Sequence, residues 1–453
     1  MIFFSILLGY LSGSVSFTNK LSNICNLSTY LHCKGDTITL QNMSHTEKQI
    51  LKDFPTLSVG PLTDDIEKKY KLLIQESGIK YFGPDVEVWT SEASNKALSY
   101  SSHGIFRYFG KFPPPIARYL IETFTQTGDL VIDPMCGSGT TGLEALLLGR
   151  RAKCFDVSPL ATLVSRVKIT PINRKEAENA IKQVRKFVEF PKKNQKPELI
   201  GLRNSSHWFL EETMDSLELI RLAIKQVKTR SSVRDFLNVA FLGVVRRVSR
   251  ATTQQGRLFL DVETAEKDAS PFFFKKAGEI LDSVTLLPKG EVNVLQRSIL
   301  GTNTEREKTP LVICHPPYFN SYKYSGVNSL ELAWMNIDHA NIRKNEIRES
   351  FKVGKPEKVE EYVEDMRAGL ENLSNLLQKN GHLALMIGDT VIRGKYIPVT
   401  RMLLARLQST YKIERAVVRI PKFTEASWAA SQRRKGKEVG INLCDLIVVL
   451  KKQ

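Results

Sequence analysis

The 453-residue sequence is poor in cysteine, and its cysteines have no recognisable spacing. The six cysteines are scattered without a Cys-x-x-Cys pair, and the seven histidines form no cluster. Zinc sites and disulfide frameworks depend on such spacings, so we expect no metal site and a reduced, cytoplasmic chain. The sequence also lacks an internal repeat with a period of about 20 to 50 residues, which excludes solenoid and propeller folds.

A long apolar run is also missing. Residues 1–17 are apolar, but they have no basic residues ahead of them, no clean cleavage site and too little length to span a bilayer. We therefore expect no membrane association. A pattern typical of a globular domain begins near Met43, so residues 1–42 are expected to be an upstream extension of doubtful structure, from a start codon assigned too early.

Positive charge is abundant and unevenly distributed. The chain has 65 Lys+Arg against 48 Asp+Glu, a net charge of +17. Residues 151–250 hold 21 basic and 10 acidic residues, and residues 391–453 hold 14 and 4, so the rest of the chain is slightly acidic. Clustering on two stretches favours a surface that follows phosphates over ordinary solvated faces, and it predicts a nucleic-acid partner.

The first half of the chain contains a parallel βαβ unit. A short apolar strand at 130–132 leads into a glycine-rich turn, a helix that ends at Gly149, and a second strand at 152–155. This order is typical of an α/β fold, and we expect a doubly wound, Rossmann-like sheet.

A helical insertion interrupts the α/β pattern. Through residues 172–290 apolar residues recur every three or four positions, whereas a strand at 311–314 restores the α/β alternation. Further helices are expected at 359–377 and 400–407, and further strands at 381–387, 413–419 and 444–450. The predicted domains are the extension at 1–42, the two parts of one catalytic domain at 43–170 and 301–453, and the basic helical insertion at 171–300.

The densest motif, Asp-Pro-Met-Cys-Gly-Ser-Gly-Thr at 133–140, follows the first strand. Together with Gly142, Gly137 and Gly139 match the pattern G-x-G-x-x-G. Glycines let backbone amides approach a ligand closely, and the following helix N-terminus favours an electronegative group. Alone the motif is weak, because NAD enzymes share it and a tight turn without ligand is the alternative.

Two aspartates make this motif more specific. Asp156 follows the second strand, where a carboxylate can accept both hydroxyls of a ribose; the alternative is an N-cap for the next helix. Asp133, at the tip of the first strand, would repel a pyrophosphate but suits the cationic amino-acid end of S-adenosylmethionine. No P-loop sequence is present, so ATP hydrolysis has no support.

The second motif, His315-Pro316-Pro317-Tyr318, directly follows the strand at 311–314. Two prolines form a rigid turn whose carbonyls can accept hydrogen bonds, and the tyrosine offers a flat face for a base. Acceptors aimed at the hydrogens of an exocyclic amino group favour the pyramidal form that can attack a methyl group. The base would have to leave the duplex, which costs about a few kcal/mol. An ordinary Pro-Pro turn with a packed tyrosine is the alternative.

Together these motifs resemble those of the DNA amino-methyltransferases, which methylate cytosine N4 or adenine N6 in restriction–modification systems. The stretch Tyr-Phe-Gly-Lys-Phe-Pro-Pro at 108–114 looks like the first cofactor motif of that family, and 381–389 resembles a later strand. The resemblance covers about residues 100–170 and 305–453. It implies the cofactor S-adenosylmethionine, double-stranded DNA as partner, and protection against a cognate restriction endonuclease that need not bind the enzyme.

The resemblance also assigns residues to roles. The base would be held by His315, Pro316, Pro317 and Tyr318. The cofactor would be bound by Lys111, Phe112, Asp133, Pro134, Cys136, Gly137, Gly139, Thr140 and Asp156.

The position of His315 departs from the family, which usually has Ser, Asp or Asn there. A carboxylate would favour adenine, whereas neutral imidazole can act as the modest acceptor that a cytosine pocket needs. We therefore favour cytosine N4 over adenine N6. Cytosine C5 methylation requires a cysteine after a proline, and no Pro-Cys dipeptide occurs.

Two other functions stay open. An RNA guanine-N2 methyltransferase would share a similar glycine loop, but residues 43–100 look too short and acidic for an RNA-capture domain. A nucleic-acid-binding protein with an inactive Rossmann domain is disfavoured by the intact Asp133 and Asp156.

The helical insertion is the expected target-recognition region. Its candidate DNA contacts are Arg246, Arg247, Arg250 and Arg257, on or just after an apolar helix. The alternative is that these arginines stabilise the helix C-terminus through its dipole. The recognition sequence and the oligomeric state do not follow from the sequence.

Overall fold

A computed structural model describes most of the chain after the N-terminal segment. The described residues are 54–81, 85–91, 93–190, 197–202, 204–254, 257–261, 263, 268–301, 305–319, 324–347, 356–392, 395–421 and 445–453. The predicted extension at 1–42 lies outside them.

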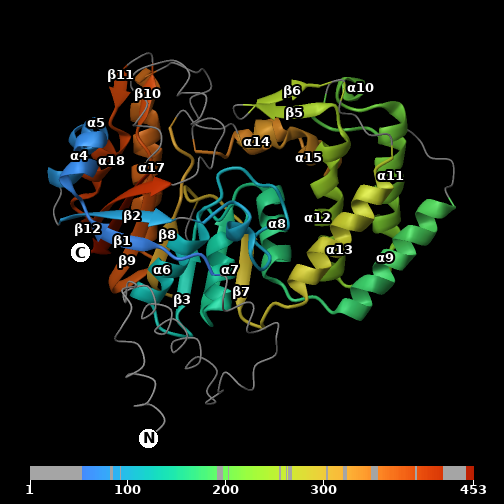
Figure 1. The fold of residues 1–453 in the computed structure, drawn as a ribbon, viewed down its shortest axis with the longest axis horizontal. Helices are drawn as coiled ribbons and strands as arrows, with labels where there is room; N and C mark the ends of the chain where they lie inside the picture. The colour runs from blue at the N-terminus through green and yellow to red at the C-terminus, as the bar shows by residue number, and fades with distance from the viewer. Residues whose placement is uncertain are drawn as a thin grey trace, which may run out of the picture. The chain divides into compact units, whose positions relative to one another are not determined.

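A mostly parallel sheet forms the centre of residues 54–453 (Figure 1). Within the described residues its strands have the order β1-β2-β12-β13-β9-β8-β3-β4-β7. The strands are β1 (Ser58–Pro61), β2 (Val86–Ser91), β3 (Leu130–Asp133), β4 (Arg151–Asp156), β7 (Val292–Gln296), β8 (Thr309–Cys314), β9 (Leu377–Ile387), β12 (Tyr411–Pro421) and β13 (Asp445–Lys452).

Most neighbouring strands of the sheet are parallel, and two strands run antiparallel to their neighbours. The five strands β7, β4, β3, β8 and β9 are parallel to one another, and β2 is parallel to β12. Strand β13 is antiparallel to both of its neighbours, and β1 adds an antiparallel edge. The predicted doubly wound, Rossmann-like sheet is confirmed.

Helices bury both faces of this sheet, because side chains alternate along each strand. Val131 and Ile313 pack against α6 (Pro114–Phe124) and α7 (Thr140–Leu147). Leu130, Ile132 and Val312 point to the opposite face. That face is covered by α4 (Asp64–Lys69), α5 (Lys71–Glu76), α17 (Val359–Ser374) and α18 (Val399–Leu407).

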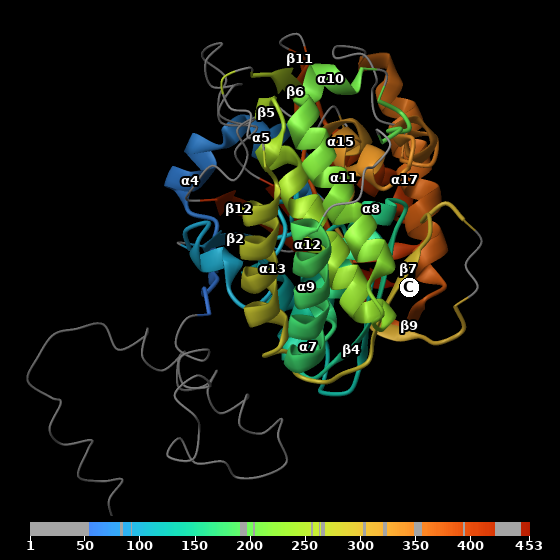
Figure 2. The ribbon, with the colours of Figure 1, turned by 90° about the vertical axis from the view of Figure 1, so that its right-hand side faces the viewer.

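A second, largely helical body is inserted between α8 (Pro159–Ile169) and β7, and it lies to the right of the sheet in Figure 1. Figure 2 shows its long helices from the front. The body has its own apolar core, to which α8 also contributes. Its elements are α9 (Arg174–Glu189), α10 (Ser205–Trp208), α11 (Glu211–Gln226), α12 (Ser231–Val248), β5 (Ala251–Gln254), β6 (Arg257–Leu260) and α13 (Ser270–Val284).

Three short helices and a small hairpin complete the described elements. They are α14 (Tyr324–Val327), α15 (Ser329–Trp334), α16 (His339–Arg343), β10 (Thr390–Ile392) and β11 (Lys395–Ile397). No helix in the described part of the chain has the length and apolar character to cross a membrane.

Three differences from the sequence predictions matter. Strand β7 lies inside the predicted insertion 171–300 but belongs to the sheet, so the inserted body ends at α13. The region before residue 100 contains the strands β1 and β2, for which the sequence analysis predicted no strand. The hairpin β5–β6 was also missed. Each of these strands is short, and β7 at the sheet edge has mostly exposed or half-buried side chains, so its apolar pattern is weak.

Candidate active site

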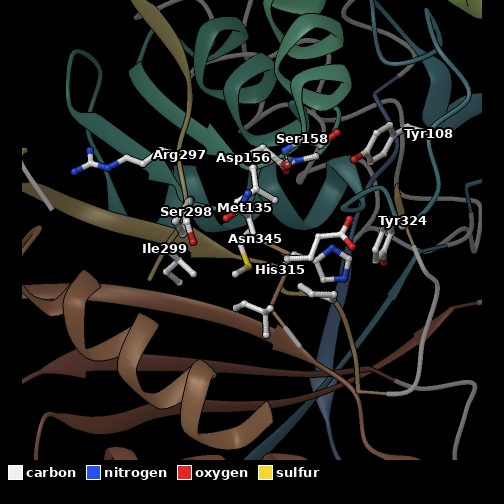
Figure 3. A pocket seen from close by; sticks show the side chains of 17 residues that line it. Tyr108, Met135, Asp156, Ser158, Arg297, Ser298, Ile299, His315, Tyr324 and Asn345 are labelled. Atoms are coloured by element: carbon white, nitrogen blue, oxygen red, sulfur yellow. Dashed lines mark hydrogen bonds between the residues drawn. The ribbon is translucent and has the colours of Figure 1, made fainter. Parts of the chain in front are cut away.

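A cavity lies where the strand order reverses between β3 and β8. The space inside it, measured to its open mouth and including open solvent, is about 690 Å³. Its wall comes from the carboxyl ends of β3, β4, β7 and β8, where doubly wound sheets bind ligands. Among the predicted site residues it is lined by Pro134, Gly137, Asp156, His315 and Pro317, which come from two motifs far apart in the sequence (Figure 3).

Glycines give the loop after β3 its shape. Gly139 has a φ of +79°, and a Cβ there would lie 2.8 Å from the hydroxyl oxygen of Ser165. A Cβ at Gly142 would lie 2.9 Å from the sulfur of Cys154, so this glycine lets α7 pack closely on β4. The glycine motif therefore has the packing roles expected of a ligand-binding βα turn, and Gly137 reaches the cavity itself.

Asp156 holds the loop and still faces the cavity. Its two carboxylate oxygens accept hydrogen bonds of 2.9 Å from the backbone amides of Gly137 and Ser158. Each oxygen keeps a lone pair for a ligand hydroxyl. The N-cap of α8 is Ser158, whose hydroxyl accepts from the amide of Ala161, so the capping alternative for Asp156 is wrong. Burial raises the pKa of Asp156 to about 6.

Asp133 takes a different place from the one predicted. It is 4% exposed, lies beneath the loop and does not line the cavity. Its carboxylate accepts a hydrogen bond of 3.1 Å from the amide of Met135, and burial raises its pKa to about 7. Asp133 therefore supports the loop, and its direct contact with a cationic ligand stays a prediction.

Other predicted cofactor residues also lie behind the wall. The Lys111 ammonium donates to the carbonyl of His103, and burial lowers its pKa to about 8. Cys136 and Thr140 are buried in the loop and at the start of α7. Phe112 is buried with its ring 5.5 Å from the imidazole of His315. Among the described residues, none of these four lines the cavity.

His315 enters the cavity from the end of β8 (Figure 3). Its ring packs edge-on against that of Tyr318, with centroids 5.4 Å apart. Burial lowers the pKa of His315 to about 4. The imidazole is therefore neutral at physiological pH and has one ring nitrogen able to accept a hydrogen bond.

The two prolines differ in the use of their carbonyls. The carbonyl of Pro317 accepts a hydrogen bond of 2.7 Å from the hydroxyl of Tyr362. This carbonyl oxygen keeps one lone pair for a further hydrogen bond. Pro316 is buried and does not line the cavity, so its contact with a base stays a prediction.

Tyr318 is anchored away from the cavity wall. Its hydroxyl donates to a carboxylate oxygen of Asp445 at 2.9 Å, and Asp445 in turn pairs with Arg419 at 2.5 Å. Its ring lies against Gly388, where a Cβ would come within 2.8 Å. This contact fixes the ring beside His315, whereas stacking of Tyr318 on a base stays a prediction.

The candidate DNA contacts in the insertion are engaged within the protein to different degrees. Arg246 is 12% exposed and forms an ion pair with Glu331, which makes it unsuitable as a free base reader. Arg247 is exposed, and its guanidinium lies over the ring of Phe272 at 5.2 Å. Arg250 donates to the carbonyl of Ser206 at 3.4 Å. The side chain of Arg257 lies outside the described atoms.

Sequence reasoning missed part of the cavity wall. Tyr108 and Gly110 line it, whereas their neighbours Lys111 and Phe112 were predicted. The residues 297–299 were missed because they follow the unpredicted strand β7, whose carboxyl end would have indicated them. Figure 3 shows Tyr324 and Asn345 in the same wall; they belong to a segment in which we found no motif.

No cluster of His, Cys, Asp or Glu suited to a metal ion occurs among the residues that the structure describes. The chemistry of the cavity instead fits a nucleoside cofactor. It combines a carboxylate at the end of β4, a glycine-rich backbone and apolar side chains such as Met135 and Ile299.

These features are those of a nucleoside-binding site at the carboxyl edge of a Rossmann-like sheet. Residues 60–163 match a family model for N6/N4 methyltransferases described as DNA methylase. The matched segment contains the glycine motif and Asp156, so it confirms the resemblance to the DNA amino-methyltransferases and S-adenosylmethionine as the cofactor of the class.

Three curated relatives to which the chain is similar are named Type II methyltransferases. The Type II methyltransferase M.BsoBI of Geobacillus stearothermophilus is 24% identical over 62% of this chain and 60% of its own length. M.MvaI of Kocuria varians is 25% identical over 52% of this chain and 58% of its own. M.MjaII of Methanocaldococcus jannaschii is 32% identical over 23% of this chain and 21% of its own length. The chain thus spans at most about three fifths of each of these relatives.

Among solved structures, TrmN from Thermus thermophilus aligns over 80% of this chain and 55% of that chain, at 12% identity and a TM-score of 0.31. The fold assignment made above comes from the strand order of the sheet.

Proposed function

We propose that the protein transfers a methyl group from S-adenosylmethionine to the exocyclic amino group of a base in double-stranded DNA, with cytosine N4 favoured over adenine N6. The observation that carries this proposal is the single cavity that joins Asp156 to His315 and Pro317. A ribose-binding carboxylate and a base-binding turn are needed together only where a nucleoside cofactor meets a nucleobase.

Each side of the cavity has a distinct task. Asp156 would accept the ribose hydroxyls, while the Gly137 backbone allows close approach of the ligand. The cofactor supplies a methyl group on a positively charged sulfur. The matches to DNA methylases support DNA as the substrate class.

The base side works through acceptors. Neutral His315 and the carbonyl of Pro316 would accept the two hydrogens of the target amino group, which makes its nitrogen pyramidal and nucleophilic. As the carbon–nitrogen bond forms, the bond between the methyl carbon and the cofactor sulfur breaks, which leaves S-adenosylhomocysteine, and the amino group then releases one hydrogen as a proton to solvent. A neutral imidazole is the modest acceptor expected for cytosine, and no carboxylate stands at position 315 to favour adenine.

The test uses the purified chain, S-adenosylmethionine and unmethylated duplex DNA, followed by mass spectrometry of the nucleosides. We expect N4-methylcytosine. N6-methyladenine would change the base but keep the mechanism, and methylation of RNA alone would overturn the DNA substrate. Long-read sequencing of DNA from a methylation-free host that expresses the gene would return the recognition sequence.

Two variants test the base side. His315→Ser should retain substantial methylation, because a hydroxyl also accepts a hydrogen bond. Tyr318→Ala should lose most activity, because it removes the ring expected to stack on the base. Tyr318→Phe keeps the ring and removes only the hydroxyl, so it tests the two contributions separately. Full activity of the Phe variant would show that the Asp445 contact is dispensable, whereas loss in both would indicate that the anchored hydroxyl matters.

We further propose that this methylation protects DNA from a cognate restriction endonuclease in the cytoplasm. DNA from an expressing host should then resist one endonuclease whose site contains the methylated sequence. Cleavage by every endonuclease with that site would contradict the proposal.

A further inference from the structure

Residues 324–347 follow the base-binding motif in the sequence but pack with the helical insertion. Trp334, from α15, is 2% exposed and lies edge-on between the rings of Phe209 and Phe241, with centroids 5.9 and 5.7 Å away. Leu330 and Ile342 belong to the same apolar core as the insertion helices. Figure 1 shows α15 beside α12, and α14 contacts α15 and the inserted strand β6.

The same segment supplies part of the cavity wall. Tyr324, at the start of the segment, and Asn345 and Glu346, near its end, all line the cavity. The hydroxyl of Tyr324 lies so close to the backbone of Gly110 that a Cβ there would come within 2.6 Å. The segment therefore closes the cavity against the loop that carries Tyr108.

One short helix, α14, joins these two functions. On one side, Glu346 accepts hydrogen bonds from the amide and the hydroxyl of Ser325, both at 3.1 Å. On the other side, the guanidinium of Arg246 donates to the carbonyl of Val327 at 2.5 Å. Helix α14 is thus held between a cavity residue and a residue of the insertion.

Arg246 has further contacts that suit a fixed position. Its guanidinium forms two hydrogen bonds with Glu331, at 3.0 and 2.8 Å, and one with the hydroxyl of Thr253 at 3.0 Å. Its charge also lies 5.7 Å from the ring of Phe109, in the loop between the cavity residues Tyr108 and Gly110. Bidentate pairing of this kind orients a side chain strongly. Arg246 itself does not line the cavity.

We propose that Arg246 is a positioning residue that couples the helical insertion to the cofactor cavity, by holding α14 and the Phe109 loop in the closed wall. This proposal rests on the proposed function, because it assigns the cavity to S-adenosylmethionine. By linkage, any shift of α12 that accompanies DNA binding then changes cofactor affinity, and the reverse also holds.

The test measures cofactor affinity without turnover. S-adenosylhomocysteine is titrated by calorimetry into the full chain, its Arg246→Met variant and the matched control Arg247→Met. Arg247 is the exposed neighbour in the same helical turn. We expect Arg246→Met to weaken binding by at least about fivefold, in the range typical of coupled sites, and Arg247→Met to leave it within about twofold.

A second variant guards against misfolding. Removal of Arg246 alone leaves the buried Glu331 carboxylate without its partner, whereas Arg246→Met with Glu331→Gln removes both charges. This double variant should fold and still bind the ligand weakly, because the contact with Val327 is absent. Amide hydrogen exchange should then be faster at 324–327 and 345–347 than in the wild-type chain.

The outcomes separate the two proposals. Wild-type affinity in both Arg246 variants would overturn the positioning role and leave the proposed function intact. Absence of binding by the wild-type chain would overturn the proposed function itself. Equal weakening by Arg247→Met would show a general charge effect and would also overturn the positioning role.

Discussion

The cavity side of the sheet and the helical insertion use charged side chains in opposite ways. Asp133 is buried and Asp156 is half-buried, neither has an ion pair among the described residues, and desolvation raises the pKa of each. The arginines of the insertion are instead paired, as in Arg221 with Glu218 and Arg246 with Glu331. Backbone amides offset part of the cost of burying both carboxylates, but only Asp156 also lines the cavity, so Asp156 is the one placed to meet a ligand.

This comparison changes the meaning of the net charge. The stretch 151–250 is strongly basic, yet several of its arginines satisfy acidic partners, among them Arg166 with Asp235 and Arg230 with Glu176. Charge counted along the sequence therefore predicts a partner class but does not identify the side chains that contact it.

The largest effect is expected from substitution of Gly139 in the cavity loop, and substitution of Gly278 in the insertion serves as the comparison. Gly139→Ala should reduce cofactor affinity by about 100-fold or more, since a left-handed φ costs an alanine about 1–2 kcal/mol and the new Cβ would clash with Ser165. Gly278→Ala in α13 has open space around its Cβ and should raise stability by about 0.4–1 kcal/mol. Calorimetric titration and thermal unfolding measure the two effects. An unaffected Gly139→Ala variant would contradict the role of the loop.

The next effect concerns Asp156. Asp156→Ala should weaken S-adenosylmethionine binding by about 1–3 kcal/mol, because the ribose hydroxyls lose a charged acceptor and the amide of Gly137 loses its partner. Isothermal titration measures the change. Glu176→Ala, in helix α9 of the insertion, is the matched carboxylate control and should leave affinity unchanged. Equal affinity of the Asp156 variant and the wild-type chain would show that Asp156 only supports the loop.

A smaller effect is expected from pH. The pKa of Asp156 is raised to about 6, so its carboxylate becomes protonated as the pH falls below 6 and then accepts hydrogen bonds poorly. Cofactor affinity should fall by up to about tenfold per pH unit there, and Asp156→Asn should flatten this dependence. His315, with a pKa of about 4, contributes only at lower pH. Asp133, with a pKa of about 7, is protonated first and affects both proteins alike. A loss of affinity below pH 6 that is equally steep in Asp156→Asn and in the wild-type chain would contradict this assignment.

The sequence predicted the regions where local pattern and chemistry coincide. Strand β3 is apolar and fully buried, and the glycine loop and Asp156 follow at fixed spacing, so both strand and site could be predicted. His315 was found for the same reason, at the end of β8. The place of Asp133 could not be predicted, because only the backbone path shows that its carboxylate turns under the loop.

The part of the cavity wall formed by residues 324–347 could not be predicted from the sequence for a different reason. Its cavity residue Glu346 is placed by Ser325, twenty-one positions earlier, and by packing on a separate helical body. No spacing in the sequence encodes that contact. Cavity residues that depend on tertiary packing between two bodies leave no motif, whereas residues at strand ends do.

The smallest expected effect tests whether any insertion arginine contacts DNA. Each phosphate that a protein neutralises adds about 0.9 to the slope of log affinity against log salt concentration. Binding of nonspecific duplex DNA should weaken steeply with salt, and Arg247→Ala should reduce the slope by about one unit, because this arginine is exposed. Arg246→Met should leave the slope unchanged, since its guanidinium is engaged with Glu331. Fluorescence anisotropy at several salt concentrations measures both slopes. A reduced slope in Arg246→Met would mean that DNA competes for the ion pair, and equal slopes in all three proteins would move the phosphate-binding surface away from α12.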